Sequence, residues 1–301
     1  MLFKDILNQF DNELKPAMEE LFQKALESQK HQGNLLLMYL NGWYDKTILE
    51  INERNGLNVS PYQIGIGYIG LSDQTHYKFI DEYRKNNISE INSDKYLEYL
   101  NEGEKDEFFF KTEKDEFSFN IETLIYLKIW ENDLFLKTWY QFSKIINGED
   151  YEWDFILKDF WNGDGLMTRP NLIREVLKKV IGNYSPIFKK HAENGYIQQV
   201  RNAIAHSNYY LFGRQITLTN FKVGDENNFI EKLTFEEWSK MFHSSIMLHN
   251  YFLWLNLKID DYYTQLYLKT GNPIEVVCNH NGQSIIANYI KDKNSQWVSK
   301  D

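Results

Sequence analysis

The stretch Arg201-Asn202-Ala203-Ile204-Ala205-His206 places an arginine, an amide and a histidine within two turns of one predicted helix. Arginine carries a permanent cation that can bind a phosphate with two donors. Histidine exchanges protons near neutral pH, because its unperturbed pKa lies there. Cleavage of RNA by its own 2'-hydroxyl group needs a cation that binds the phosphate and a group that transfers protons. The stretch therefore predicts a phosphodiester-cleaving site at a helix end, with Arg201 and His206 as the catalytic pair.

Helix geometry indicates which of these side chains share a face, because residues three or four apart lie on the same side. The expected buried stripe consists of Ile197, Val200 and Ile204. Asn202 and His206 are four apart and point away from it, so the amide is expected to orient the imidazole. Arg201 lies roughly 140° around the helix from His206. Either the helix distorts near Ser207, or a second copy of the protein completes the site, which is the more economical interpretation.

The hexapeptide and the following Ser207-Asn208-Tyr209-Tyr210 resemble the signature of the HEPN superfamily, in which arginine, a polar residue and three or more further positions precede a histidine. This resemblance implies an all-helical bundle that forms a homodimer, with both Arg/His pairs in a cleft between protomers. Active members cut RNA without a metal and leave a 2',3'-cyclic phosphate and a 5'-hydroxyl. Many members are toxins or antiviral effectors, and others only bind.

The resemblance also implies a role for each matching residue. Arg201 would stabilise charge on the scissile phosphate, His206 would be the general base or acid, and Asn202 would orient it. Tyr209 matches a tyrosine often found three positions after the histidine, which makes it a candidate substrate-binding residue. Some members carry an acid followed by a lysine on an earlier helix. Asp133 and Lys137 have that spacing here, but an ordinary helical ion pair has it too, and they are left out of the site.

The predicted fold is mainly α, a HEPN-like bundle with a helical N-terminal region and short β-hairpins near the motif and at the C-terminus. The expected division is 1–117, a helical region of unknown role; 118–270, the bundle; and 271–301, a hairpin extension. Expected helices cover 2–29 (kinked or divided at Pro16), 34–54, 74–85, 121–147, 151–160, 169–181, 186–206 (interrupted near 194–195) and 234–266. Expected hairpins cover 209–222 and 274–290, and a hairpin or an acidic connection lies around 112–114.

Composition and charge limit the classes of function. The 301 residues are 43% hydrophobic and 16% aromatic, which suits a packed core, with base stacking as the alternative use of the aromatic rings. A net charge of -10 argues against a broad nucleic-acid-binding surface. Residues 168–214, however, contain eight lysines and arginines against two acids. These cations either capture an RNA phosphate or form the solvated faces of helices.

Several other classes of protein are not expected. The single Cys278 excludes an internal disulfide, and the N-terminus lacks the pattern of a signal peptide. A cytoplasmic protein is therefore expected. The longest apolar run, 245–259, is too short and too polar to span a bilayer, so no membrane helix is expected. His243 and His249 are six apart on one helix and are poor co-ligands. We expect them to be core or surface residues, and we expect neither metal nor cofactor.

Three functional hypotheses follow from these observations. The first is a metal-independent endoribonuclease that acts on RNA as a homodimer, in a toxin or antiviral role, with an antitoxin or other regulatory partner. The second is a catalytically inactive, dimeric binding or regulatory module. The third and weakest is a nucleotide-binding enzyme built on Gly65-Ile66-Gly67-Tyr68-Ile69-Gly70, which has the dinucleotide-binding glycine spacing but lacks the alternating strands and helices that give it meaning. A glycine-rich turn is the preferred interpretation of that stretch.

Overall fold

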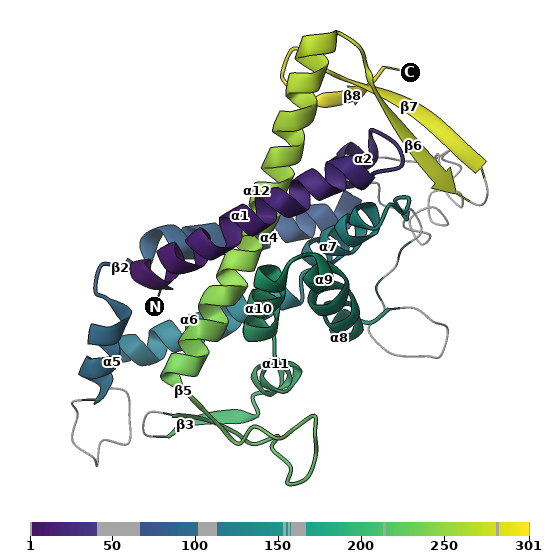
Figure 1. The fold of residues 1–301 in the computed structure, drawn as a ribbon. Coiled ribbons are helices and arrows are strands. Elements are labelled where there is room, and N and C mark those ends of the chain that lie inside the picture. The colour runs from purple at the N-terminus through teal and green to yellow at the C-terminus, as the bar shows by residue number, and fades with distance from the viewer. Residues whose placement is uncertain are drawn as a thin grey trace, which may run out of the picture. The chain divides into compact units, whose positions relative to one another are not determined.

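The computed structural model describes residues 2–40, 67–101, 113–152, 155, 157, 167–212, 215–280 and 283–300. These residues are predominantly helical, and the strands form three small sheets (Figure 1). The predicted mainly α fold class is confirmed. Within the described residues, no helix is both long and apolar enough to cross a lipid bilayer.

Contacts between residues divide the chain into two compact units that alternate along the sequence. The first unit comprises Met1–Ala17, Gln74–Asn132 and Ile181–Asn250, and the second comprises Met18–Asp73, Asp133–Val180 and Tyr251–Asp301. Helices α1 (Lys4–Ser28) and α12 (Phe235–Thr270) each contribute residues to both units. The predicted three-part division of the chain stays a prediction.

The first unit contains α11 (Gln198–Ala205), the helix that carries the motif. It also contains α5 (Ser93–Asn101), α6 (Glu113–Trp130), α9 (Gly182–Tyr184), α10 (Pro186–Gly195) and the part of α4 (Gly67–Asn86) from Gln74 onward. Its core forms where α6 meets the first turns of α12. The indole of Trp238 lies 5.2 Å from the ring of Phe119 and 5.5 Å from that of Tyr126, measured between centroids. The same indole donates at 2.8 Å to the carboxylate of the buried Glu122.

The first residues of the chain are tied to this core by a buried histidine. Strand β1 (Leu2–Phe3) pairs in parallel with β2 (Ile88–Ser89). The backbone N–H of Phe3 donates to Nε2 of His243 at 2.8 Å, while Nδ1 of that ring lies 2.7 Å from the carbonyl oxygen of Ser239. One nitrogen therefore accepts and the other donates, which is the pattern of a neutral imidazole. The prediction that His243 and His249 are core or surface residues is confirmed, since both are buried.

The start of α12 is capped by two side chains. The backbone N–H of Glu237 donates to the hydroxyl of Thr234 at 3.1 Å, and the Glu237 carboxylate accepts from the backbone N–H of Thr234 at 2.8 Å. This reciprocal arrangement is a capping box. Strand β5 (Lys232–Thr234) therefore passes directly into the helix, which continues to Thr270, four residues beyond the predicted end.

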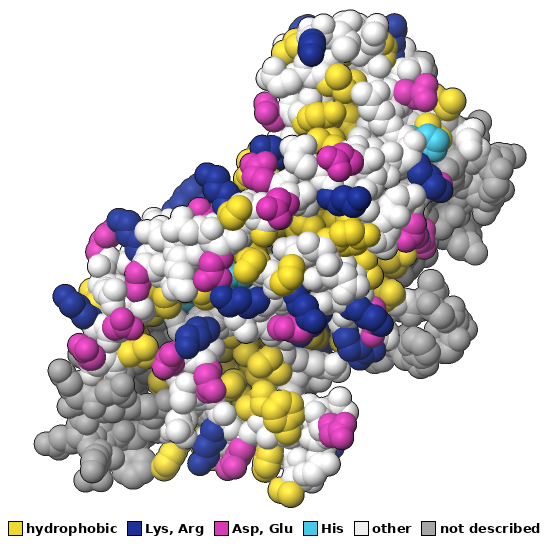
Figure 2. Space-filling model, viewed as in Figure 1, with side chains coloured by type: hydrophobic (Ala, Val, Ile, Leu, Met, Phe, Trp, Pro, Cys, Tyr) yellow, Lys and Arg dark blue, Asp and Glu magenta, His cyan; other side chains and the backbone are white. Residues whose placement is uncertain are grey.

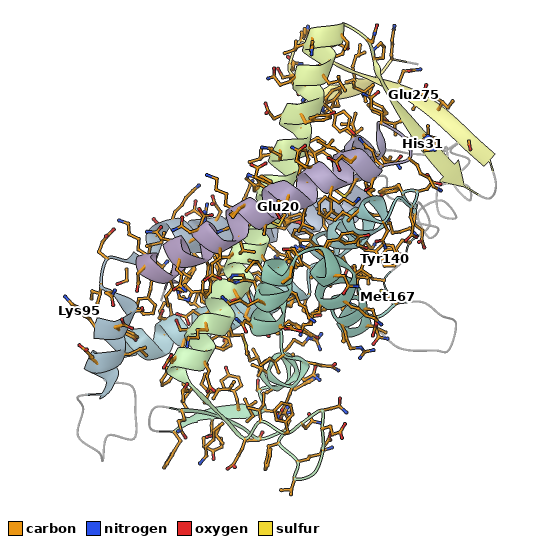
Figure 3. The ribbon with its side chains drawn as sticks, in the orientation of Figure 1. Glu20, His31, Lys95, Tyr140, Met167 and Glu275 are labelled. Carbon is orange, nitrogen blue, oxygen red and sulfur yellow. The ribbon has the colours of Figure 1, made fainter. Side chains whose placement is uncertain are left out.

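The second unit packs three helices and a sheet around the later turns of α12. These helices are α2 (Asn34–Leu40), α7 (Asp133–Ile146) and α8 (Arg169–Leu172), followed by the π-helix η1 (Ile173–Ile181), whose last residue belongs to the first unit. The turn before α2 lies against β6 (Ile274–His280), and a Cβ added to Gly33 would come 2.1 Å from the carbonyl oxygen of Glu275. Figure 3 labels His31 in this turn and Glu275 on β6. Only glycine fits this close approach.

The C-terminal sheet confirms the predicted hairpin and adds one strand. Strands β6 and β7 (Gln283–Lys291) pair antiparallel, and β8 (Trp297–Ser299) pairs with β7. The Asp260 carboxylate of α12 accepts from the ammonium of Lys291 at 2.6 Å and from the indole N–H of Trp297 at 2.7 Å. These bonds fasten the sheet to its helix.

Several predicted elements differ from the observed ones. The predicted helix 121–147 is two helices, α6 and α7, separated at Glu131 and Asn132. Of the two effects predicted for Pro16, a kink or a division, division is wrong, because Pro16 lies inside the continuous helix α1. Gly67 starts α4, so residues 67–70 are helical and do not form a glycine-rich turn; positions 65 and 66 lie outside the described residues.

Three further predictions fall partly outside the described residues. The prediction of a hairpin around 112–114 is wrong for residues 113 onward, because they are helical. The predicted helix 34–54 is confirmed to Leu40, and 41–54 lie outside the described residues. In the predicted helix 151–160, the described positions 151, 152, 155 and 157 are not helical.

The buried histidines of the first unit make stability depend on pH. Burial lowers the pKa of His243 to about 4 and that of His249 to about 3, whereas an unfolded histidine titrates near 6.5. Between these values the unfolded state binds more protons. We therefore expect the free energy of unfolding to fall as pH drops from about 6.5 to 5, by up to roughly 1.4 kcal/mol per pH unit for each histidine. Urea unfolding at several pH values measures this slope.

Substitution of one buried histidine identifies the source of the slope. His243→Gln should reduce it, because the variant lacks a histidine whose pKa burial lowers. An equal slope in His243→Gln and the unaltered protein would contradict the assignment.

Candidate functional site

The motif lies on α11, which is separated from α10 by a break at Tyr196 and Ile197. The interruption predicted near 194–195 is confirmed. A Cβ added to Gly195 would lie 3.2 Å from the indole of Trp130 and 3.3 Å from the backbone nitrogen of Ser245. The Ser245 hydroxyl accepts from the indole N–H of Trp130 at 3.0 Å and lies 2.9 Å from the carbonyl oxygen of Gly195. Helices α6 and α12 therefore fix the position at which α10 ends.

The inner face of α11 confirms the predicted apolar stripe. Val200 and Ile204 are buried, and Ile197 is half-buried at the start of the helix. Gln199 is also buried on this side. Its side-chain amide bonds to both polar backbone groups of Ile230, donating to the carbonyl at 2.7 Å and accepting from the N–H at 2.9 Å. These bonds join α11 to the loop that precedes β5.

The side chain of Arg201 is held by an acid that the sequence analysis missed. Its Nε and Nη2 atoms both contact Oε1 of Glu131, and Nη1 donates to the amide oxygen of Asn202 at 2.9 Å. The side chain of Arg201 is 21% exposed and that of Glu131 is 35% exposed. Three of the five guanidinium N–H groups are used in these bonds. One N–H on each Nη atom therefore remains for a ligand, counting only partners among the described residues.

A buried aromatic layer supports this ion pair. Tyr126 and Tyr196 are buried, and the ring of Tyr196 lies 5.0 Å from that of Trp130. Burial raises the pKa of Tyr196 to about 12 and also raises the pKa of Tyr126, while the cation of Arg201 acts in the opposite direction on both. Both phenols stay protonated near neutral pH and are not candidates for a general base.

His206 lies at the other end of the motif, on the surface. It caps α11, and its backbone N–H donates to the carbonyl of Asn202 at 3.1 Å. Ser207 then takes a left-handed conformation (φ 55°), and the N–H of Asn208 donates to the carbonyl of Ala203 at 2.7 Å. The imidazole is exposed and bonds to no side chain among the described residues. The expected orienting bond from Asn202 is not observed, because its amide oxygen binds Arg201 instead.

The side chain of Tyr209 packs against the core in this structure. Tyr209 is the first residue of β3 (Tyr209–Phe212), pairs with Leu218 of β4 (Gln215–Leu218) and places its half-buried ring 6.1 Å from that of Phe119. The hairpin predicted here is confirmed, and β5 extends it to three strands. The substrate-binding role of Tyr209 stays a prediction.

The remaining charged candidates are engaged in ion pairs. Asp133 binds Arg169 at 2.8 Å in place of Lys137, which is buried. Among the eight cations of residues 168–214, salt bridges are formed by Arg169, Arg174, Lys179, Lys189, Lys190 and Arg201. Neighbouring carboxylates thus offset much of the positive charge of this segment, in agreement with the solvated helix faces considered above. The described residues contain no group of three His, Cys, Asp or Glu side chains that could hold a metal ion.

The structure brings Arg201, Asn202 and Glu131 together and leaves His206 apart from them, at the exposed end of the helix. Glu131 could have been found from the polar run Glu131-Asn132-Asp133 inside an otherwise apolar predicted helix, since Asn and Asp favour helix starts. Comparison of the chain with protein-family models, curated proteins and solved structures found no match.

The Glu131–Arg201 pair should stabilise the fold more than an exposed pair does. In a double-mutant cycle with Glu131→Ala and Arg201→Ala, we expect a coupling of about 1 kcal/mol, measured by urea unfolding, because the pair is partly buried and uses two donors. The matched control is Lys189–Glu193, a pair 3.8 Å apart with both side chains about half exposed. It should give only a few tenths of a kcal/mol. Equal couplings would contradict the prediction.

Proposed function

We propose that this chain is a cytoplasmic, metal-independent endoribonuclease of HEPN type whose site is centred on Arg201 and His206. The observation that supports this proposal is that α11 carries two different functional groups. A positioned guanidinium retains two N–H groups for an anion, and an exposed imidazole caps the same short helix. These are the phosphate-binding and proton-transferring groups that the sequence motif predicts.

The proposed reaction uses the RNA's own nucleophile. The 2'-oxygen forms a bond to the adjacent phosphorus, and the bond from phosphorus to the 5'-oxygen breaks. The products are a 2',3'-cyclic phosphate and a 5'-hydroxyl. His206 removes the proton from the 2'-hydroxyl or supplies one to the leaving oxygen, and Arg201 stabilises the charge on the phosphate. Glu131 and Asn202 position the guanidinium, because three of its donors bind them.

A homodimer is part of the proposal. Arg201 and His206 point in different directions from one helix, so a second copy can supply the partner of each pair. The toxin or antiviral role, with an antitoxin or other regulatory partner, rests on the HEPN resemblance alone.

The second candidate function is a HEPN-like binding or regulatory module without catalysis. Two observations favour it: Arg201 is engaged by a carboxylate, and no described side chain orients His206. A phosphate would have to share the guanidinium with Glu131.

RNA cleavage in excess chelator separates the two functions. The full-length protein should cleave within a panel of tRNA and total RNA and leave cyclic-phosphate ends. Arg201→Ala and His206→Ala should each lower the rate by at least about a hundredfold, because a phosphate-binding cation or a proton-transfer group is lost. Arg174→Ala and His31→Ala remove an exposed arginine and a partly exposed histidine elsewhere and should cleave normally.

Two results would count against the ribonuclease. If the unaltered protein and both motif variants leave RNA intact while sedimenting as folded dimers, the binding module is supported. If His206→Ala cleaves at the unaltered rate, the motif is not the catalytic centre.

A further inference from the structure

The sheet that follows the motif presents one face to the core and one face outward. Strands β3, β4 and β5 pair antiparallel in that order. On the inner face, Ile216, Leu218 and Leu233 are buried. Because side chains alternate along a strand, the register assigns the opposite face to Tyr210, Phe212, Gln215, Thr217, Lys232 and Thr234. This set is called the outer face below.

Two aromatic side chains dominate the accessible part of the outer face. Tyr210 is 51% exposed and Phe212 is 56% exposed. Both lie on the edge strand β3, two residues apart, which separates them by roughly 7 Å along the strand. Figure 2 shows hydrophobic side chains gathered at the surface where Figure 1 places β3 and β5. Successive bases of a single strand can each stack on a ring at such a spacing, because every base has a π-face.

The outer face offers one cation to a phosphate backbone. Lys232 is the one charged residue among the six, and its half-exposed ammonium lies on β5, 3.9 Å from the carboxylate of Glu231. An exposed pair of this length contributes little stability, so a phosphate can compete with the carboxylate for the ammonium. Thr217 pairs with both Tyr210 and Lys232 and is itself buried, so the accessible surface of this row belongs to the ring and the cation. Two strand spacings, about 10 Å, separate them. A protein-docking centre is typically depleted of lysine and more continuously apolar.

The outer face also begins close to the proposed catalytic histidine. Only Ser207, Asn208 and Tyr209 separate His206 from Tyr210. The left-handed Ser207 turns the chain, and Asn208 is fixed by bonds to Ala203 on α11 and to Thr219 after β4, at 2.7 and 2.9 Å. The end of α11 therefore passes directly into the edge strand.

We infer that the outer face binds single-stranded RNA, with two unpaired bases stacked on Tyr210 and Phe212 and a backbone phosphate near Lys232. The inference rests on the proposed ribonuclease, because it names unpaired RNA as the substrate. Duplex RNA does not fit this mode, since its bases stack on one another and cannot reach the rings.

The test measures RNA affinity separately from cleavage. In a His206→Ala background, with excess chelator, fluorescence anisotropy follows a fluorescein-labelled single strand of about 12 nucleotides, and the same strand annealed to its complement. Tyr210→Ala combined with Phe212→Ala should weaken single-strand binding by at least about tenfold. Phe117→Ala, which removes a phenylalanine of the same unit that is 66% exposed, should bind normally.

Two further variants separate stacking and charge from folding. Tyr210→Phe combined with Phe212→Tyr keeps both rings and should keep the affinity. Lys232→Gln should lower the salt dependence of binding by about 0.7 in log–log slope, the value for one single-strand phosphate contact. The duplex should bind more weakly than the single strand.

Distinct outcomes overturn this inference and the proposed function. Unaltered affinity in the double alanine variant, or no single-strand binding at all, overturns the inference even if the unaltered protein cleaves RNA. A double alanine variant that changes its sedimentation and keeps its RNA affinity marks the outer face as a protein contact and also overturns it. If the unaltered protein does not cleave RNA, but single-strand binding requires both rings, the RNA-binding role of the outer face is supported and the proposed ribonuclease activity is contradicted.

Discussion

The hydrogen-bonded connection from the Trp130 indole through the Ser245 hydroxyl to the Gly195 carbonyl is the contact on which the motif depends. It joins the end of α6, an early turn of α12 and the last residue of α10. A side chain at Gly195 would crowd Trp130 and Ser245, so α10 ends close against this contact and α11 starts after the break that follows it. The direction of α11 in turn decides where Arg201 and His206 point.

Arg201 and His206 share one helix but not one environment. The guanidinium is positioned by a carboxylate and an amide above buried tyrosines, whereas the imidazole projects from a helix cap toward solvent. Preorganised charge close to a low-dielectric layer interacts with an anion more strongly than exposed charge does. The described residues of its own unit give the imidazole no such support. The side chain of Arg201 is thus already positioned for an anion, whereas the imidazole of His206 needs a substrate or another chain to orient it.

The helical class, the buried stripe of α11 and both hairpins could be predicted from the sequence, because they depend on local periodicity and turn residues. The break between α6 and α7 could not be predicted from the aromatic pattern, since that pattern continues across Glu131 and hides the polar run there. Missing that break also meant missing the partner of Arg201. The bond predicted between Asn202 and His206 is absent for a related reason. Spacing along the helix shows which side chains can meet, but the Asn202 amide oxygen accepts from Arg201, whose guanidinium Glu131 holds nearby.

The amide of Gln199 takes the place of a peptide group, because it both donates to and accepts from the backbone of Ile230. The base of the loop between β4 and β5 is therefore fastened to α11 much as a neighbouring strand would fasten it. The backbone bonds at the tip, from Asp225 to Lys222 and from Lys222 to Asn228, stay within the loop. Val223 is 91% exposed there, and a Cβ added to Gly224 would meet no atom within 4 Å. Insertions at the tip leave the register at the base intact. An epitope or fluorophore-binding peptide inserted after Gly224 would report on the protein while leaving α11 and its motif in place.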